Sequence, residues 1–163
     1  MSDVAVAVRP MTREDLPAVG RLATLLVALH HELDPRRFIA ATPETPAGYA
    51  RYLGSQVGKL GVTLLVAERE GKIVGYAYAG VEGFDYMALR GLAGVVYDVV
   101  VDPEHRRGGI GGTLLEAAAD ALEAGGVPRV LISTADRNEP AQGLFEKVGF
   151  RRTMIEMTRE VGG

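Results

Sequence analysis

Residues 99–115 read VVVDPEHRRGGIGGTLL, and this stretch decides the fold around it. The valines form a β-branched run typical of a buried strand, and Pro103 ends that run. Two arginines and four glycines follow, after which apolar residues recur at helical spacing. The first turn of a helix has free N–H groups and a dipole that attract an anion. The pattern therefore predicts a phosphate-binding turn between a strand and a helix.

The spacing of this turn separates three designs of phosphate site. A Walker loop requires Lys before Ser or Thr, but a glycine precedes Thr113. A dinucleotide fingerprint requires G-x-G-x-x-G, and Leu114 stands where the third glycine belongs. The remaining pattern is Arg/Gln-x-x-Gly-x-Gly/Ala, which Arg106, Gly109 and Gly111 match. An ordinary glycine-rich connection between strand and helix is the alternative interpretation.

A second motif lies at residues 138–150, which read NEPAQGLFEKVGF. Asn138 suits the N-cap of a helix, and Pro140 falls in the first turn, where its missing N–H does no harm. Gly149 can close the helix in a left-handed conformation. Taken alone, the motif indicates a well-capped helix.

Together the two motifs resemble those of the GNAT superfamily of N-acetyltransferases. In that family the first motif binds the pyrophosphate of acetyl-CoA, and the helix of the second flanks the pantetheine arm, which pairs with the strand before the turn. The resemblance implies a set of cofactor-binding residues: Val99, Val101, Arg106, Arg107, Gly108, Gly109, Gly111, Gly112, Asn138 and Phe145. It also implies an α/β fold with a mixed central sheet of about six to seven strands and about four helices.

Periodicity and turn residues predict the order β-α-α-β-β-β-α-β-α-β along nearly the whole chain. Strands are expected at 4–8, 62–68, 73–81, 92–101, 130–134 and 150–160, and helices at 15–31, 47–57, 111–124 and 138–148. The length of 163 residues suits a single domain spanning 1–163.

The catalytic base is harder to place. Many GNAT relatives carry a glutamate at the position of Val95 or Tyr97, and this chain has none there. Asp98 is the nearest carboxylate, and Tyr97 could relay a proton through water, so these two are the candidate catalytic residues. On a regular strand Tyr97 shares a face with Val99, and Asp98 points the other way unless a β-bulge intervenes. A structural role for Asp98, packing of Tyr97, and a positioned water as base are the alternatives.

Phe145 departs from the family pattern, in which a tyrosine hydroxyl often protonates the departing thiolate. A thiol has a pKa of ~8.5, so the CoA thiolate is already a good leaving group. The loss of the tyrosine hydroxyl need not abolish catalysis. We therefore hold two hypotheses. The first is an acetyl-CoA-dependent N-acetyltransferase acting on a primary amine by direct attack in a ternary complex. The second is a non-catalytic GNAT-like CoA-binding sensor or interaction module.

Composition and simple sequence patterns argue against several other classes of protein. The net charge is −3 with no basic tail, which gives no case for nucleic-acid binding. The chain has no cysteine, which excludes thiol catalysis and cysteine-based zinc sites. Neighbouring His30 and His31 would point about 100° apart on a helix, and no metal is expected. With no apolar run of ~20 residues and no signal-peptide pattern, a cytoplasmic protein without membrane contact is expected.

Acceptor contacts are expected from segments 30–38 and 82–90, where Glu32, Asp34 and Asp85 would suit a cationic amine. A polyamine, an aminoglycoside, an amino acid or a protein amino group all remain open. The predicted strand 150–160 alternates apolar and polar residues. In this fold such a strand often pairs across a dimer, which favours a homodimer.

Overall fold

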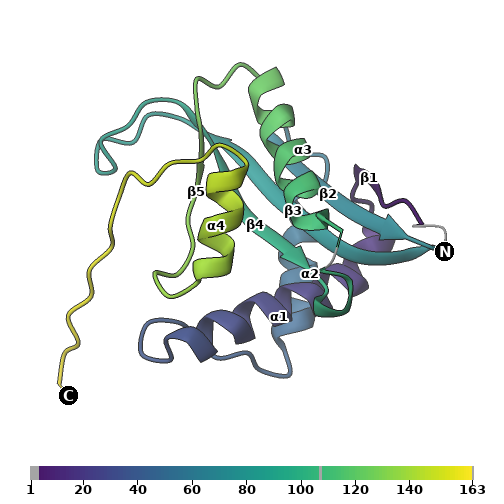
Figure 1. Ribbon diagram of the computed structural model, residues 1–163, viewed down its shortest axis with the longest axis horizontal. Coiled ribbons are helices and arrows are strands. Elements are labelled where there is room, and N and C mark those ends of the chain that lie inside the picture. The colour runs from purple at the N-terminus through teal and green to yellow at the C-terminus, as the bar shows by residue number, and fades with distance from the viewer. Residues whose placement is uncertain (1–3, 107, 163) are drawn as a thin grey trace.

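A five-stranded sheet organises residues 4–106 and 108–162, which the computed structural model describes (Figure 1). The strands lie in the order β1 (Ala7–Pro10), β2 (Val62–Arg69), β3 (Lys72–Glu82), β4 (Ala93–Val101) and β5 (Val130–Ile132). Neighbours are antiparallel except β4 and β5, which run parallel. Helices α1 (Leu16–Leu33) and α2 (Thr45–Gln56) cover one face, and α3 (Ile110–Ala124) and α4 (Glu139–Lys147) lie on the other. This architecture confirms the predicted mixed α/β fold.

Two apolar layers hold the helices against the sheet. Leu114, Leu115 and Leu122 of α3 are buried on one face, and Leu22 of α1 and Leu53 of α2 are buried on the other. Residue spacing explains both, because apolar positions three and four apart form one stripe of a helix. The sheet is thus covered by helices on both faces.

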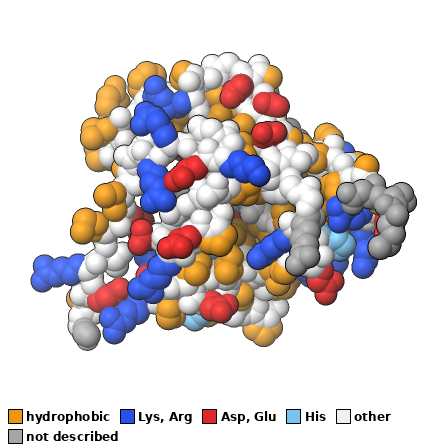
Figure 2. All heavy atoms as spheres, viewed as in Figure 1, with side chains coloured by type: hydrophobic (Ala, Val, Ile, Leu, Met, Phe, Trp, Pro, Cys, Tyr) orange, Lys and Arg blue, Asp and Glu red, His pale blue; other side chains and the backbone are white. Residues whose placement is uncertain are grey.

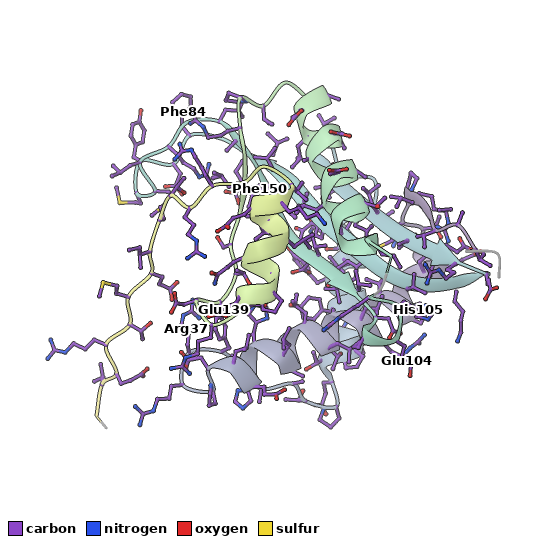
Figure 3. The ribbon with its side chains drawn as sticks, viewed as in Figure 1. Arg37, Phe84, Glu104, His105, Glu139 and Phe150 are labelled. Carbon is purple, nitrogen blue, oxygen red and sulfur yellow. The ribbon has the colours of Figure 1, made fainter. Side chains whose placement is uncertain are left out.

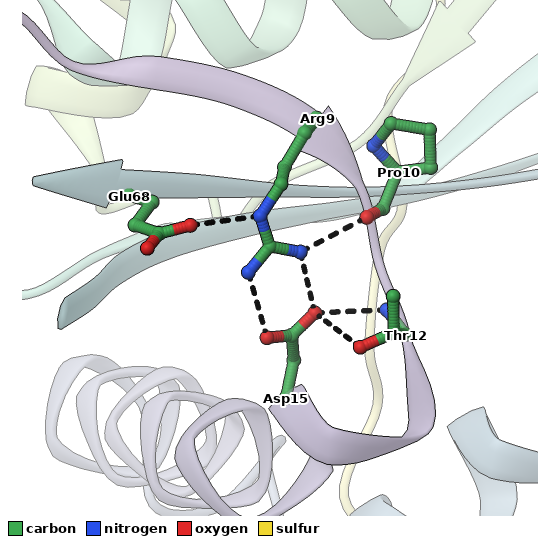
Figure 4. A network of polar contacts seen from close by, with 5 residues as sticks. All are labelled: Arg9, Pro10, Thr12, Asp15 and Glu68. Carbon is green, nitrogen blue, oxygen red and sulfur yellow. Dashed lines mark hydrogen bonds and ion pairs between the residues drawn. The ribbon is translucent and has the colours of Figure 1, made fainter. Parts of the chain in front are cut away.

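Arg9 ties the first strand to the sheet and to the start of α1 (Figure 4). Its Nε donates to Glu68 Oε2 at 2.8 Å, and its Nη1 and Nη2 donate to the two carboxylate oxygens of Asp15 at 2.8 and 2.9 Å. Asp15 also accepts the Thr12 backbone N–H at 2.8 Å. These bonds to Arg9 hold the pKa of the buried Asp15 carboxyl below its ordinary value. The network fixes the point at which the chain leaves the sheet for α1.

The predicted strand at 150–160 is wrong. Residues 151–160 are extended but form no strand, and every one of them is exposed. The segment leaves the body of the molecule toward the C-terminus (Figure 1), held by an ion pair between Arg37 and Glu156 and another between Arg152 and Glu146. A strand needs a hydrogen-bonded neighbour as well as alternating side chains, and this segment has none within the described residues. The sheet therefore has five strands among the described residues, rather than six to seven.

Candidate functional site

The predicted phosphate-binding turn joins β4 to α3. After a short 3-10 turn at Pro103–His105, Gly108 and Gly109 adopt positive φ values of 111° and 74°, and α3 begins at Ile110. Residues with a side chain rarely adopt these φ values, which explains why glycine occupies both positions. The chain thereby reverses direction within a few residues and aims the start of α3 back along β4.

The first turn of α3 leaves its backbone donors free for an anion. The first ladder bond of the helix runs from the Thr113 N–H to the Gly109 carbonyl at 3.0 Å. The N–H groups of residues 109–112 therefore have no partner within the helix. Gly111 and Gly112 also bring α3 close to α4, since a Cβ at either position would contact Leu144 at 3.2 or 3.6 Å. Backbone rather than side chains forms this surface.

Arginine side chains surround the turn. Arg106 is exposed, and its Nε donates to the Val101 carbonyl at 3.5 Å. Arg107 lies outside the described residues. Sequence reasoning missed Arg69, the last residue of β2, whose Nη2 lies 3.6 Å from where a Cβ on Gly108 would sit. The Nε of Arg69 is buried and has no hydrogen-bond partner among the described residues.

Strand β4 parts from β5 halfway along its length. Their parallel pairing covers only Gly94–Val96 of β4 and Val130–Ile132 of β5. Further along β4, the Asp102 N–H donates to the Val74 carbonyl of β3 at 2.8 Å. Because donors alternate along a strand, the N–H groups of Val99 and Val101 point away from β3, toward the edge where β5 has ended. An extended ligand could pair with β4 at this edge.

A β-bulge at Tyr97 changes which face the candidate catalytic residues share. Ala79 pairs with Val96 while the adjacent Tyr78 pairs with Asp98, so Tyr97 is the extra residue of β4. The bulge turns both Tyr97 and Asp98 toward α2, while Val99 packs on the α3 side. The expectation that Tyr97 shares a face with Val99 is therefore wrong. The bulge that would bring Asp98 to the site is present.

Tyr97 and Asp98 line a pocket between α2 and the sheet, with a volume of about 580 Å³. The lining comprises Gly48, Tyr49, Tyr52 and Leu53 of α2, Tyr78 and Glu82 of β3, and Tyr97 and Asp98 of β4. The sequence alone gave no reason to group these tyrosines. The nearest signal is the position of Tyr76 and Tyr78 on opposite sides of Ala77 in one strand, which places both rings on one face.

Asp98 is the carboxylate at the inner end of this pocket. Its Oδ2 accepts the hydroxyl of fully buried Tyr76 at 2.9 Å. Burial raises the pKa of Asp98 above its ordinary value, and the Tyr76 bond and the charge of His30 oppose that rise only in part. A carboxylate with a raised pKa binds a proton more readily than a solvated one, which suits a general base.

The tyrosines of the pocket form a connected wall. Their rings pack with centroids 6.1 Å apart for Tyr52 and Tyr78 and 4.7 Å apart for Tyr78 and Tyr97. The Tyr52 and Tyr78 hydroxyls are 3.1 Å apart, and the Tyr97 hydroxyl donates to Glu82 at 2.7 Å. Burial, together with the bond to Glu82, raises the pKa of Tyr97 to about 12. Tyr97 therefore stays protonated at neutral pH and presents a hydroxyl rather than a charge.

The carboxylates expected to bind an acceptor lie elsewhere. Asp34 accepts the Arg36 N–H at 3.2 Å, and Asp85 accepts the Met87 N–H at 2.9 Å, so each stabilises its own turn. Glu32 does not line the pocket either. From the predicted segment 82–90, Glu82 is the residue that reaches it.

The second motif forms the predicted helix, α4. Asn138 Oδ1 accepts the Ala141 N–H at 3.2 Å, which confirms the N-cap. Phe145 packs against the apolar layer under α3, its ring centroid 6.2 Å from that of Phe150, which Figure 3 shows beside α4. Phe145 is thus a packing residue that carries no hydroxyl.

Away from the pocket, exposed hydrophobic side chains gather at the β3–β4 turn, where Phe84, Tyr86 and Met87 are 76–90% exposed. Figure 2 shows acidic and basic side chains interspersed, with hydrophobic ones gathered over the β3–β4 turn, where Figure 3 labels Phe84. Among residues 4–106 and 108–162, no three potential metal ligands come together. Within the same residues, no helix has the length and apolar character needed to cross a membrane.

Comparisons with known proteins agree with the two motifs. The sequence model of the Acetyltransferase (GNAT) family matches residues 56–150. A mycothiol acetyltransferase of Thermobispora bispora is 35% identical over 96 residues, which cover 56% of this chain and 31% of that protein. The chain thus spans about a third of the length of the curated relatives it matches.

Solved structures share the fold over almost the full length. A Bacillus halodurans protein is 23% identical, with a TM-score of 0.83 over 95% of this chain and 99% of that one. An aminoglycoside N-acetyltransferase solved in complex with CoA is 16% identical, with a TM-score of 0.70 over 99% of this chain and 98% of that one. At these identities the likeness shows a common fold.

Proposed function

Since this chain belongs to the acetyltransferase (GNAT) family, we propose that it transfers the acetyl group of acetyl-CoA to a primary amine by direct attack in a ternary complex. The observation that carries the proposal is the course of β4. Its C-terminal end leads into the phosphate-binding turn, and its bulge presents Asp98 to the pocket under α2. One strand therefore links a site for a phosphorylated cosubstrate to a site for an amine.

The cosubstrate side uses mostly backbone. The N–H groups of Gly109, Gly111 and Gly112 bind the pyrophosphate, and Arg106 and Arg69 supply positive charge. The free N–H groups at the start of α3 and the unpartnered Nε of Arg69 support this assignment, because both are donors suited to an anion. The same proposal gives phosphate contacts to Gly108 and Arg107.

The pantetheine arm pairs with β4 where β5 has ended. The N–H groups of Val99 and Val101 serve as its partners, and Asn138 and Phe145 flank it from α4. One of the two strand N–H groups also polarises the thioester carbonyl, as an oxyanion hole does. The short pairing of β4 with β5 supports this arrangement, because it leaves room for a strand-like ligand.

Asp98 acts as the general base. It takes a proton from the ammonium group of the acceptor, and the neutral nitrogen attacks the thioester carbon. The new C–N bond forms and the C–S bond breaks. The nitrogen then loses its second proton to solvent, the CoA thiolate takes a proton from solvent, and Asp98 returns its own proton to solvent. Tyr97 lies beside Asp98 with its hydroxyl held by Glu82, and it orients water or the acceptor nitrogen for this transfer.

Phe145 favours the second candidate, a CoA-binding module without turnover, as does the lack of a carboxylate at Val95 or Tyr97. Phe145 cannot donate a proton to the thiolate, and it packs against Phe150 instead. Because a thiol has a pKa of ~8.5, the CoA thiolate can leave without a protein group to protonate it. We therefore favour the enzyme over the module. Steady thiol release with any amine removes the module hypothesis.

The test measures thiol release from acetyl-CoA over a panel of amines, with Asp98→Asn as the variant. We expect kcat to fall by about 10²–10⁴-fold while the Kd for acetyl-CoA is unchanged. Asp120→Asn, an exposed change on α3, controls for the loss of one negative charge. Full activity of Asp98→Asn would contradict its role as base, and an absence of turnover with every amine would contradict the enzyme.

The exposed C-terminal segment extends the proposal to a homodimer. Met154, Ile155 and Met157 are 80–90% exposed, which is costly for large apolar side chains in water. The segment pairs with a second copy of the chain, where its alternating residues gain a strand partner. Sedimentation analysis of the full chain and of a chain ending at residue 150 tests this. A full-length monomer at high concentration would refute it.

A further inference from the structure

The pocket under α2 contains one carboxylate without a cationic partner. Glu82 forms an ion pair with Arg90 and accepts the Tyr97 hydroxyl at 2.7 Å, so its charge is already balanced. Asp98 forms no ion pair with any residue in 4–106 or 108–162, and the hydroxyl it accepts from Tyr76 is neutral. His30 acts on Asp98 from outside the pocket lining, and within the lining Asp98 is the carboxylate left to bind an ammonium group.

The walls around that charge are aromatic. Tyr52, Tyr78 and Tyr97 form a continuous aromatic wall, and Tyr49 of α2 also lines the pocket. Aromatic faces attract ammonium groups and also pack edge-to-face or offset against flat apolar groups. A ligand that places its ammonium group at Asp98 would rest the remainder of its body against these rings.

This arrangement disfavours each of the four acceptor classes that the sequence leaves open. A polyamine or an aminoglycoside carries several ammonium groups, and each extra one would lose water without gaining a partner. An α-amino acid carries a carboxylate, and none of the described lining residues is a lysine or arginine. The fourth, a protein amino group, would enter on a lysine side chain or a main-chain N-terminus, and neither an aliphatic chain nor a polar peptide backbone offers the rings a flat apolar surface.

We propose that the acceptor is a primary amine with one positive charge and a flat, apolar body of the arylalkylamine type. Asp98 binds its ammonium group, and Tyr52, Tyr78 and Tyr97 bind the ring. The pocket volume of about 580 Å³ lies within the usual range for small-molecule sites, roughly 300–1,000 Å³. This inference rests on the proposed function, because it names the acceptor of the same reaction.

The first experiment compares kcat/KM for matched amines with acetyl-CoA saturating. Phenethylamine represents the proposed acceptor class. Phenylalanine is the same molecule with an added carboxylate, and ethylamine lacks the aromatic ring. Spermidine and kanamycin represent the polycations. We expect phenethylamine to exceed each of the other four by at least about tenfold, which is the size of one lost aromatic or charge interaction.

The second experiment removes one ring. Tyr52 is about half exposed on α2, so Tyr52→Leu leaves the buried layers intact. We expect kcat/KM to fall about tenfold for phenethylamine and to change little for ethylamine. Tyr86→Leu, a change in the exposed β3–β4 turn, is the matched control and should alter neither value.

The outcomes separate this inference from the proposed function. Faster acetylation of spermidine, kanamycin or phenylalanine than of phenethylamine would overturn the acceptor class and leave the acetyltransferase standing. An equal loss for phenethylamine and ethylamine in Tyr52→Leu would overturn the role of the ring. Failure of every amine while acetyl-CoA still binds would overturn the proposed function, and the acceptor class with it.

Discussion

The predicted phosphate-binding turn and the proposed acceptor pocket lie on the same strand but are built in opposite ways. The turn is one continuous stretch, 99–115, and its surface is backbone that glycines leave uncovered. The pocket is made of side chains from α2, β3 and β4, which are distant in sequence. A backbone site recognises what all cosubstrates of one kind share, whereas a side-chain site can change with each substitution. The difference explains why the cosubstrate can be inferred from a motif and the acceptor requires the structure.

The largest expected effect tests the backbone character of the turn. Gly112→Glu places a carboxylate in the first turn of α3, where it stabilises the helix but repels a phosphate. The new Cβ would meet Leu144 at an ordinary 3.6 Å, so the fold is retained. We expect the Kd for CoA to rise more than about 100-fold, measured by calorimetric titration.

Two further variants isolate the cause. Gly112→Gln has nearly the same size without the charge, and it should weaken binding less than Gly112→Glu. Gly83→Glu adds the same charge in the β3–β4 turn, where a Cβ meets nothing within 4 Å. Unchanged affinity in Gly112→Glu would contradict the phosphate assignment.

The next effect concerns Arg69, a half-buried residue at the end of β2 whose buried Nε has no hydrogen-bond partner among the described residues. Arg69→Met should raise the Kd for CoA about tenfold, because a charge-assisted hydrogen bond to phosphate is lost. Arg51→Met, an exposed change on α2, is the control. Repeating the titration with dephospho-CoA locates the contact. A persistent loss places Arg69 at the pyrophosphate, and no loss places it at the 3′-phosphate. Wild-type affinity of Arg69→Met for CoA would show that the turn acts without it.

The smallest effect is on stability and belongs to the pocket. Burial raises the pKa of Asp98 in the folded state above its ordinary 3.8, so the ionised carboxylate destabilises the fold. This cost is absent at pH values below the unfolded pKa and grows as the pH rises through the folded pKa. We expect Asp98→Asn to raise the Tm at pH 7 by about 2–4 °C, and to leave it unchanged near pH 3.

Thermal unfolding followed by circular dichroism at the two pH values checks this expectation. A gain of equal size at both would mean that packing, rather than ionisation, separates Asp98 from Asn. A lower Tm at pH 7 would mean that the charge of Asp98 stabilises the fold. Either result would contradict the expectation that the ionised carboxylate of Asp98 destabilises the fold.

The sequence predicted those parts of the fold that depend on neighbours along the chain. The turn at Gly108 and Gly109 and the N-cap at Asn138 were read from local spacing, and both are present. The sequence could not predict whether a bulge occurs at Tyr97, because the bulge depends on the pairing register between β4 and β3. The segment 150–160 had the alternation of a strand without a partner to pair with, and pattern alone does not supply one.

The acceptor pocket was outside the reach of sequence for a related reason. Tyr52 and Tyr97 meet through α2 and β4, and nothing in their spacing connects them. Arg69 reaches Gly108 because the sheet brings the end of β2 beside the turn after β4. In each case the missing information was tertiary packing.

The most direct test of acetyl-CoA binding at the turn after β4 is a calorimetric titration of the full chain with acetyl-CoA at moderate salt. We expect saturable binding at one site per chain, with a Kd on the order of 1–100 µM, within the range of ordinary substrate affinities. An absence of binding at millimolar acetyl-CoA would contradict it. The turn at 108–112 would then be an ordinary connection between β4 and α3.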